Sequence, residues 1–253
     1  MKVSDAGGLV EFYDAAYTQA DPDRAELYAR WRELGAVGKA DHVTALCAQA
    51  RLRPRSTLEI GCGDGALLCE LRARGFGGRL AGVEITQAAV DIAGTRPQIE
   101  SVQLYDGERL RAGDGEYELG ILEHVLEHVL DPVALLAEAA RACRAIVVEV
   151  PLEANVSARR ALKREHAEEV GHLQRLDRAR VRAIVAEAGL SVAGELDDPL
   201  PRSVHTFFAK TPFARAGGTA KWMTRLAVHG LSPDLARRLF TVHYACLCLP
   251  RAA

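Results

Sequence analysis

The apolar positions of this chain follow two patterns that take turns along the sequence. Short uninterrupted apolar runs are typical of buried strands, whereas apolar residues three or four apart indicate the inner face of a helix. Between residues 56 and 151 each apolar run is followed by a new element. The runs are 57–60, 79–83, 102–105, a run ending at Glu123, and 145–150. This alternation predicts an α/β fold with a mainly parallel, doubly wound sheet and right-handed crossovers.

The first fifty residues show helical spacing only. Apolar residues recur at helical intervals in 9–17, and Asp23 is the expected cap of a longer helix. Gly35 and Gly38 are expected to interrupt that helix, because glycine weakens a helix interior. A third helix then ends before Pro54. We therefore expect three helices before the sheet.

Capping signals place the later elements. Asp131 with Pro132, and Asp177, are typical helix starts, and Gly189 is a typical stop. The last two strands are expected at 190–196 and 241–249, with helical pieces at 220–228 and 234–240 between them. We interpret the chain as one domain, 1–253. Its expected parts are an N-terminal helical lid (1–53), a core (54–198), a helical insertion on the substrate side (199–240) and the last strand (241–253).

Candidate chemistry begins where the first strand meets the first helix of the sheet. The segment Glu59-Ile60-Gly61-Cys62-Gly63-Asp64-Gly65 places three alternating glycines before a helix. Glycine allows a sharp turn and lets a ligand approach the main-chain N–H groups. The positive end of the next helix points to the same place. The segment therefore predicts a loop that binds a nucleoside cofactor.

Two cofactors fit a glycine loop of this kind. Gly61-x-Gly63-x-x-Ala66 satisfies the loose dinucleotide fingerprint, and Glu84 lies at the distance expected of a ribose-binding acid in either case. The acids Glu59 and Asp64 would repel a pyrophosphate. They suit S-adenosylmethionine (SAM), which has no phosphate and carries an ammonium and a sulfonium group. The loop therefore favours SAM.

Several segments in order resemble the motifs of class I SAM-dependent methyltransferases, over roughly residues 55–195 and the last strand. These are 59–65 as motif I, Glu84 at the end of strand two, Asp106-Gly107 after strand three, YELGILEHVLEHVLDP (117–132) with Leu126-Glu127-His128, and Gly171-His172-Leu173. The resemblance implies a seven-stranded Rossmann-like methyltransferase fold. It also implies SAM as cofactor, S-adenosylhomocysteine (SAH) as product and in-line methyl transfer.

The resemblance also implies where the cofactor is bound. Glu59 is expected to meet the methionine ammonium, Glu84 the ribose hydroxyls and Asp106 the adenine amino group. Tyr13, Tyr17 and Lys39 are the candidate contacts from the lid. The complete expected set is Tyr13, Tyr17, Glu59, Gly61, Cys62, Gly63, Gly65, Glu84, Ile85, Asp106, Gly107 and Glu123.

Three histidines are the candidate catalytic residues, because an oxygen acceptor usually needs a base. His124 is the first candidate, since it directly follows the fourth strand at the edge where α/β ligands bind. His128 matches the family signature and is expected to form structural hydrogen bonds. His172 is expected either to reach the substrate from the opposite wall or to cap a helix. We expect no metal, because the region 149–155 does not match the aspartate and asparagine ligands of catechol-type enzymes.

The composition of the chain limits which binding partners and which cellular location we expect. The net charge is −2, with 32 basic and 34 acidic residues, so no nucleic-acid or membrane partner is expected. Six cysteines fit neither a zinc motif nor a disulfide scaffold, and no signal-like segment opens the sequence. We therefore expect a cytoplasmic protein that methylates a small molecule at oxygen or nitrogen. A non-catalytic SAM-binding sensor or scaffold is the alternative. An NAD(P)-dependent reductase is less favoured, because no Tyr-x-x-x-Lys pair is present.

Overall fold

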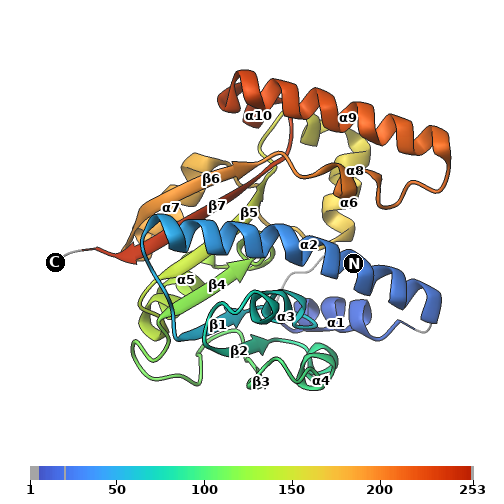
Figure 1. The fold of residues 1–253 in the computed structure, drawn as a ribbon. Helices are drawn as coiled ribbons and strands as arrows, with labels where there is room; N and C mark the ends of the chain where they lie inside the picture. Colours follow the sequence, from blue (N-terminus) through green and yellow to red (C-terminus); the bar gives the residue numbers. More distant parts are fainter. Residues whose placement is uncertain (1–5, 20, 252–253) are drawn as a thin grey trace.

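A seven-stranded sheet forms the centre of the protein (Figure 1), whose computed structural model describes residues 6–19 and 21–251. The strands are β1 (Ser56–Ile60), β2 (Arg79–Glu84), β3 (Ser101–Leu104), β4 (Leu119–Glu123), β5 (Ile146–Leu152), β6 (Leu190–Asp198) and β7 (Val242–Pro250). Their order is β3-β2-β1-β4-β5-β7-β6. Neighbouring strands are parallel except around β7, which is antiparallel to β5 and β6. The predicted doubly wound, mainly parallel sheet is confirmed, and its order reverses between β1 and β4, where ligands bind in such sheets.

Helices cover both faces of the sheet. On one face lie α2 (Pro22–Gln49) and α3 (Ala66–Ala73), and on the other lie α5 (Pro132–Ala142) and α7 (Arg178–Glu187). The other helices are α1 (Ala6–Tyr17), α4 (Gln87–Gly94), α6 (Ala161–Glu169), α8 (Arg202–Thr206), α9 (Pro212–Leu231), α10 (Pro233–Leu239) and the short 3-10 turns η1 (Leu126–His128) and η2 (Ser157–Arg159). Both α1 and the α8–α9 pair lie on the side toward which the parallel strands point (Figure 1).

The helix α2 corrects the expectation for the N-terminal region. It runs 28 residues without a break through Gly35 and Gly38, and Asp21 rather than Asp23 is its cap. Five of its residues form one buried face against the sheet: Ala36, Ala40, Val43, Leu46 and Cys47. This packing outweighs the cost of roughly 1 kcal/mol for each glycine in a helix. Two helices, α1 and α2, therefore stand where three were expected.

Strand alternation decides which residues face α2. In β5, Val147 packs on the α2 side, whereas Ile146 and Val148 pack on the α5 side. Because side chains alternate along a strand, Glu149 points to the same side as Val147. All seven residues of β5 are buried, so this carboxylate lies inside the protein.

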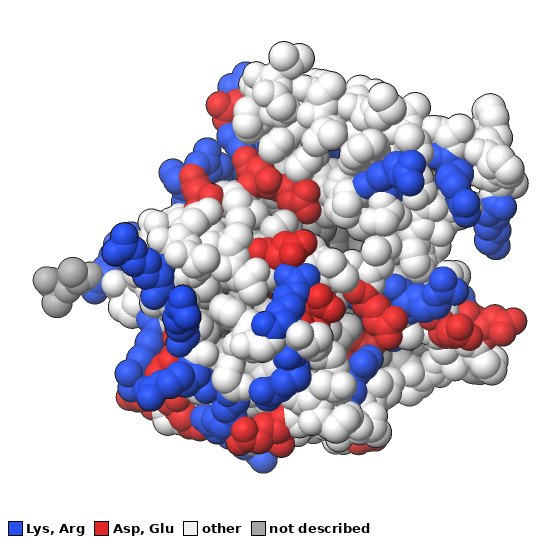
Figure 2. Space-filling model, in the orientation of Figure 1, with Lys and Arg blue, Asp and Glu red and all other residues white. Residues whose placement is uncertain are grey.

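Within the helical insertion before β7, the helix expected at 220–228 is longer than predicted. This helix, α9, spans 20 residues, and α10 begins at the expected cap, where Ser232 Oγ accepts the Leu235 N–H at 3.2 Å. Two large apolar side chains of α9 are almost fully exposed, Phe213 at 90% and Leu231 at 87%. The surface over α9 and α10 is accordingly mostly free of charge (Figure 2). Among the described residues, no helix combines the length and apolar content needed to cross a membrane.

The six cysteines are all unpaired thiols. Five of them are buried, and Cys69 on α3 is the one that is partly exposed.

Candidate functional site

The glycine loop between β1 and α3 needs glycine for its conformation and for the space above it. Gly61, Gly63 and Gly65 have φ angles of 76°, 54° and 78°, all in the left-handed region. A Cβ on Gly63 would lie 2.6 Å from the hydroxyl of Tyr17, and one on Gly61 would lie 2.7 Å from a methyl group of Val125. Neighbouring side chains therefore pack directly on the main chain of the loop, where a residue with a Cβ would clash.

Glu84, the last residue of β2, holds this loop in place by hydrogen bonds to the main chain. Its carboxylate accepts the Gly63 N–H at 2.9 Å and the Ile85 N–H at 2.7 Å. Burial raises the pKa of the carboxyl, and these main-chain bonds oppose the increase. Glu84 thus fixes the glycine loop in addition to its expected role toward a ribose.

Asp64 forms ion pairs within the protein. It is 2% exposed, and it accepts from Arg32 Nε at 2.7 Å and lies 3.4 Å from Arg96 Nη2. Arg32 also lies over the ring of Tyr17, with its guanidinium carbon 5.1 Å from the ring centre. The motif aspartate therefore ties the loop to α2 and to the segment that follows α4.

The two tyrosines predicted as lid contacts both reach the site from α1. The hydroxyl of Tyr17 lies over Gly63, and the hydroxyl of Tyr13 lies 2.5 Å from His128 Nδ1. Burial and nearby carboxylates raise the pKa of both hydroxyls above the usual range. Both side chains are therefore neutral hydrogen-bonding groups at the edge of the glycine loop.

Three buried carboxylates line the α2 side of neighbouring strands. They are Glu59 of β1, Glu123 of β4 and Glu149 of β5, each less than 5% exposed. Burial raises the pKa of Glu59 to about 8 and that of Glu123 well above its usual range. The positive charge of Lys39, on α2, partly offsets both increases. Figure 2 shows acidic side chains on this face of the molecule, beside a hollow.

Two of these carboxylates are suited to a cationic ligand. Among the described residues, Oε2 of Glu59 and both oxygens of Glu123 have no hydrogen-bond partner. A buried acceptor left unpaired costs about 1–3 kcal/mol, so a ligand with N–H donors and a positive charge would recover that energy. The methionine ammonium of SAM has both properties. The residues present therefore fit this cofactor.

Asp106 and Gly107 form a tight turn after β3. Asp106 Oδ1 accepts the N–H groups of Glu108 at 2.8 Å and Arg109 at 2.9 Å, and these bonds lower the pKa of the carboxyl. Asp106 lines an open cleft with about 390 Å³ of empty space, together with Val83 and Tyr105. The turn geometry engages one carboxylate oxygen, and the cleft places Asp106 beside a space for a ligand.

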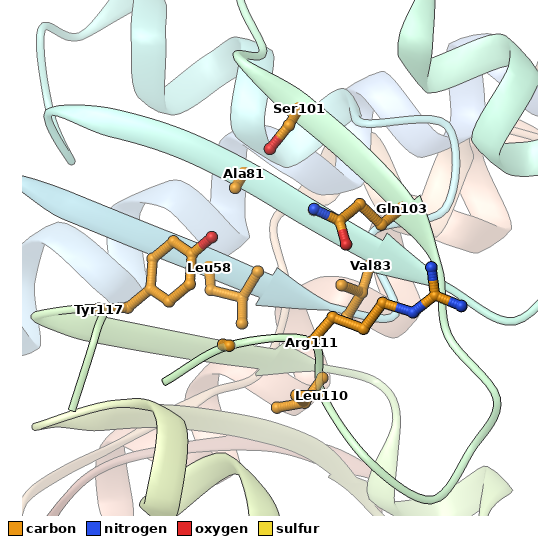
Figure 3. A pocket seen from close by; sticks show the side chains of 10 residues that line it. Leu58, Ala81, Val83, Ser101, Gln103, Leu110, Arg111 and Tyr117 are labelled. Carbon is orange, nitrogen blue, oxygen red and sulfur yellow. The ribbon is translucent and has the colours of Figure 1, made fainter. Parts of the chain in front are cut away.

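A second, smaller cleft lies under the connection from β3 to β4 and has about 240 Å³ of space that is open to solvent (Figure 3). Leu58 of β1, Val83 of β2 and Gln103 of β3 line it, with Arg111 and Tyr117 from the connection. No helix covers these strands there, because the described connection 105–118 contains none. Val83 and Gln103 line both clefts.

His124 is held at both ring nitrogens. Its Nδ1 lies 3.0 Å from Glu127 Oε1, and its Nε2 lies 3.2 Å from His243 Nδ1 and 3.5 Å from Glu149 Oε1. Burial lowers the pKa of the ring, but the bonds to Glu127 and Glu149 outweigh this and raise the pKa above its ordinary value. The backbone φ of His124 is 60°, which is costly for a residue other than glycine. The ring is therefore fixed in a polar network.

His128 and His172 form a second group beside the first. Their ring centres are 4.7 Å apart. His128 Nδ1 contacts the Tyr13 hydroxyl and, at 3.1 Å, the carbonyl of Gly171. His172 Nδ1 lies 2.8 Å from Glu153 Oε2. The structure thus brings all three predicted histidines to the same edge of the sheet, with Glu127 between His124 and His128.

Three polar residues of this edge were not predicted as site residues. Glu149 Oε1 lies 2.9 Å from His243 Nδ1, and its Oε2 lies 2.6 Å from His42 Nδ1. The three histidine bonds outweigh burial and hold the pKa of Glu149 well below its usual range. A single acid within the apolar run 145–150 was the available signal for Glu149. His42 and His243 carried no such local signal.

Comparison with known proteins assigns this architecture to a family. A family model described as "Methyltransferase domain" matches residues 28–194, which is more than half of the chain. Two curated relatives match over part of their length. An uncharacterised 37.1 kDa protein of transposon TN4556 from Streptomyces fradiae is 38% identical over 94 residues, 35% of this chain and 27% of that protein. A ubiquinone biosynthesis O-methyltransferase from Thiobacillus denitrificans is 27% identical over 143 residues, 54% of this chain and 58% of that protein.

Solved structures share the fold at low sequence identity. One is the complex of the Haloferax volcanii Trm112 methyltransferase activator with a methyltransferase, with TM-score 0.62, 17% identity and coverage of 97% of this chain and 99% of that one. Another is magnesium protoporphyrin IX methyltransferase from Synechocystis PCC 6803 with bound SAH, with TM-score 0.59, 15% identity and coverage of 98% and 100%.

The chain spans 27% and 58% of the lengths of these two curated relatives. The family match over residues 28–194 covers strands β1 to β5, the glycine loop and Glu84. The chain therefore belongs to the methyltransferase domain family.

Proposed function

We propose that the protein transfers a methyl group from SAM to an oxygen or nitrogen atom of a small-molecule acceptor. The observation that carries this proposal is the left-handed glycine loop, which is held by Glu84 and flanked by Glu59, whose Oε2 has no hydrogen-bond partner among the described residues. The resemblance to a ubiquinone biosynthesis O-methyltransferase supports an oxygen acceptor. When bound, SAM supplies an activated methyl group, so the protein's main task is to align the acceptor.

In this proposal the cofactor residues have separate tasks. Glu59 holds the ammonium, Glu84 holds the ribose while fixing the loop, and Asp106 holds the adenine amino group. Tyr13 and Tyr17 close the site from α1. The remaining contacts come from Gly61, Cys62, Gly63, Gly65, Ile85, Gly107 and the main chain of Glu123.

For an oxygen acceptor we assign the proton acceptor to His172. Its Nδ1 is held by Glu153, and its Nε2 has no hydrogen-bond partner among the described residues. A carboxylate that orients one ring nitrogen leaves the other available to take a proton. His124 has partners at both nitrogens, and His128 Nδ1 is engaged by Tyr13, so we give these two histidines positioning roles.

We also propose roles for the flanking parts. The N-terminal helices form a lid, because α1 reaches the glycine loop through Tyr17. The insertion α8–α10 borders the acceptor side and selects the acceptor. Its position beyond the strand ends supports this assignment (Figure 1).

Calorimetric titration of the purified protein with SAH and, separately, with NADH tests the cofactor. We expect micromolar binding of SAH and none of NADH, and the reverse result would reject the proposal. An acceptor screen with SAM labelled in the methyl group then tests the reaction. SAH binding without transfer to any acceptor would favour the sensor alternative.

A further inference from the structure

We propose that His124, Glu149 and His243 form a binding site for one divalent transition-metal ion, with Zn²⁺ as the ion that best fits these ligands. The site lies at the edge of the sheet where β4 and β5 end and β7 begins. It is independent of the proposed methyl transfer, because it can be tested by metal binding alone.

The distances between the three donor atoms match those of a metal site. His124 Nε2 and His243 Nδ1 are 3.2 Å apart, and Glu149 Oε1 is 2.9 Å from the second and 3.5 Å from the first. In a tetrahedral site with bonds of about 2.0–2.1 Å, neighbouring ligand atoms lie roughly 3.3–3.4 Å apart. Movements of a few tenths of an ångström would therefore complete the geometry.

Without an ion, protons must lie among these three atoms. If His124 Nε2 and His243 Nδ1 both carry a proton, both donate to Glu149 Oε1, and the two protonated nitrogens are only 3.2 Å apart. If only one of them carries a proton, the other presents its lone pair to Glu149. An ion at the centre would be bound by all three lone pairs at once, and the protons that the atoms share would pass to solvent.

Two of the ligands are also hydrogen-bonded on the side that faces away from this centre, and these bonds fix their orientation toward it. The other nitrogen of His124 is held by Glu127 at 3.0 Å, and the other oxygen of Glu149 is held by His42 at 2.6 Å. His42 in turn lies 3.3 Å from Asp198. Carboxylate partners of this kind fix the orientation of metal-binding histidines in known sites. Two of the three ligands therefore have the supporting partners that a metal site needs.

The fold places the ligands by strand register and one backbone distortion. Glu149 pairs with Ala245, and His243 pairs with Pro151, so Glu149 and His243 share the α2 face. His124 follows Glu123 and would point to the opposite face in a regular strand. Its positive φ breaks that alternation, and its ring centre lies 4.5 Å from that of His243.

The ligand set indicates the ion and its coordination. Two imidazoles and one carboxylate suit Zn²⁺, and three protein ligands leave a fourth position for water or an acceptor oxygen. A neighbouring group, Glu127 with His128 and His172, also has donor atoms close together. In that group Glu127 Oε1 is already bonded to His124 Nδ1 at 3.0 Å and lies 3.8 Å from His128 Nε2, so the group serves as the control.

The test uses the full chain without an affinity tag, stripped of metal with a chelator. Co²⁺ is titrated while its visible absorption is recorded, and Zn²⁺ affinity is measured by competition with a chromophoric chelator. We expect one equivalent to bind, with the strong absorption of four-coordinate Co²⁺. This result comes from the native protein and does not depend on whether a variant folds.

Variants then locate the site. Glu149→Gln and His243→Gln should weaken Zn²⁺ binding by at least about 100-fold, and His42→Gln by about 10–100-fold. His172→Gln, in the control group, should leave Zn²⁺ affinity unchanged. SAH binding and the circular dichroism spectrum show whether each variant is folded.

Three outcomes would overturn the proposal. They are no stoichiometric binding by the native protein, binding that persists in folded Glu149→Gln and His243→Gln, or binding lost in His172→Gln. SAH titration of the metal-free protein is a separate measurement, so failure of the metal site leaves the cofactor assignment standing.

Discussion

At the scale of single residues, Glu84 links the shape of the glycine loop to cofactor binding. Its carboxylate holds the N–H groups of Gly63 and Ile85, and hydrogen bonds to a charged acceptor contribute about 1.5–3 kcal/mol each. We expect Glu84→Ala to weaken SAH binding at least about tenfold, measured by calorimetry. Glu108→Ala, at an exposed position after the β3 turn, is the control. An unchanged dissociation constant for Glu84→Ala would remove Glu84 from the site.

If His172 accepts the proton, replacing it should lower turnover and leave cofactor affinity unchanged. Replacing the ring by an amide that cannot take a proton should lower kcat by about 10²–10⁴-fold for an oxygen acceptor. The dissociation constant of SAH should stay the same in His172→Gln. We expect Glu153→Gln to lower kcat less, since it only loosens the orientation of the ring. Normal turnover by His172→Gln would exclude His172 as the base.

The raised pKa of Glu59 predicts that cofactor binding releases a proton. With a pKa of about 8, this carboxyl is mostly protonated at pH 7 in the free protein. A bound ammonium favours the ionised form, so the proton leaves. Calorimetry of SAH binding at pH 7 in two buffers of different ionisation enthalpy should show this release, and Glu59→Gln should reduce it. Equal heats in both buffers for the native protein would contradict the assignment.

The same carboxyl makes the free energy of unfolding depend on pH. Between pH 4.5, its ordinary value, and about 8, Glu59 keeps a proton in the folded state that it loses in the unfolded chain. The folded state then binds more protons, so the contribution of Glu59 to the free energy of unfolding falls as the pH rises through this range. The loss is complete above the folded pKa.

At the scale of elements, α2 carries three cationic side chains over the acids of the site. Arg32 pairs with Asp64, Lys39 lies near Glu59 and Glu123, and His42 bonds to Glu149. The bonds to Asp198 and Glu149 outweigh burial and raise the pKa of His42 to about 10. One helix thus spans both the cofactor loop and the histidine network.

The two glycines inside α2 allow a prediction about the stability of this helix. A Cβ on Gly35 or Gly38 would meet nothing within 4 Å, so alanine fits. Gly38→Ala should raise the free energy of unfolding by about 0.5–1 kcal/mol, measured by denaturant unfolding. Gly78→Ala is the contrast, because its φ is 61° and a Cβ would lie 2.1 Å from the Arg55 carbonyl oxygen. We expect it to destabilise by more than about 1–3 kcal/mol. A destabilised Gly38→Ala would mean that the helix needs that glycine.

At the scale of the whole molecule, a bound cofactor should stabilise the fold. SAH at 100 times its dissociation constant adds about 2.7 kcal/mol to the free energy of unfolding. For a chain of 253 residues this corresponds to a rise in Tm of roughly 5–10 °C. Differential scanning calorimetry with and without SAH measures it, with adenosine as the control ligand. No shift at saturating SAH would contradict binding to the native state.

The sequence predicts what local patterns determine. The strand-and-helix alternation gave the sheet, and the spacing of Gly61, Gly63 and Gly65 located the loop, because each depends on neighbouring residues. The long helix α2 was missed, since Gly35 and Gly38 signal a break and only packing against the sheet overrides it. The contacts of Glu149 with His42 and His243 join residues about a hundred positions apart. No short-range pattern contains them.

The burial of five cysteines gives the molecule a built-in labelling position. Only Cys69 is open to a thiol-reactive dye in the native state, and its N–H donates to the carbonyl of Gly65 at the end of the glycine loop. Burial raises the pKa of this thiol, so labelling proceeds faster in mildly alkaline buffer. A fluorophore there would sit one helical turn from the loop. Fluorescence could then follow ligand binding in real time, without any cysteine being removed or introduced.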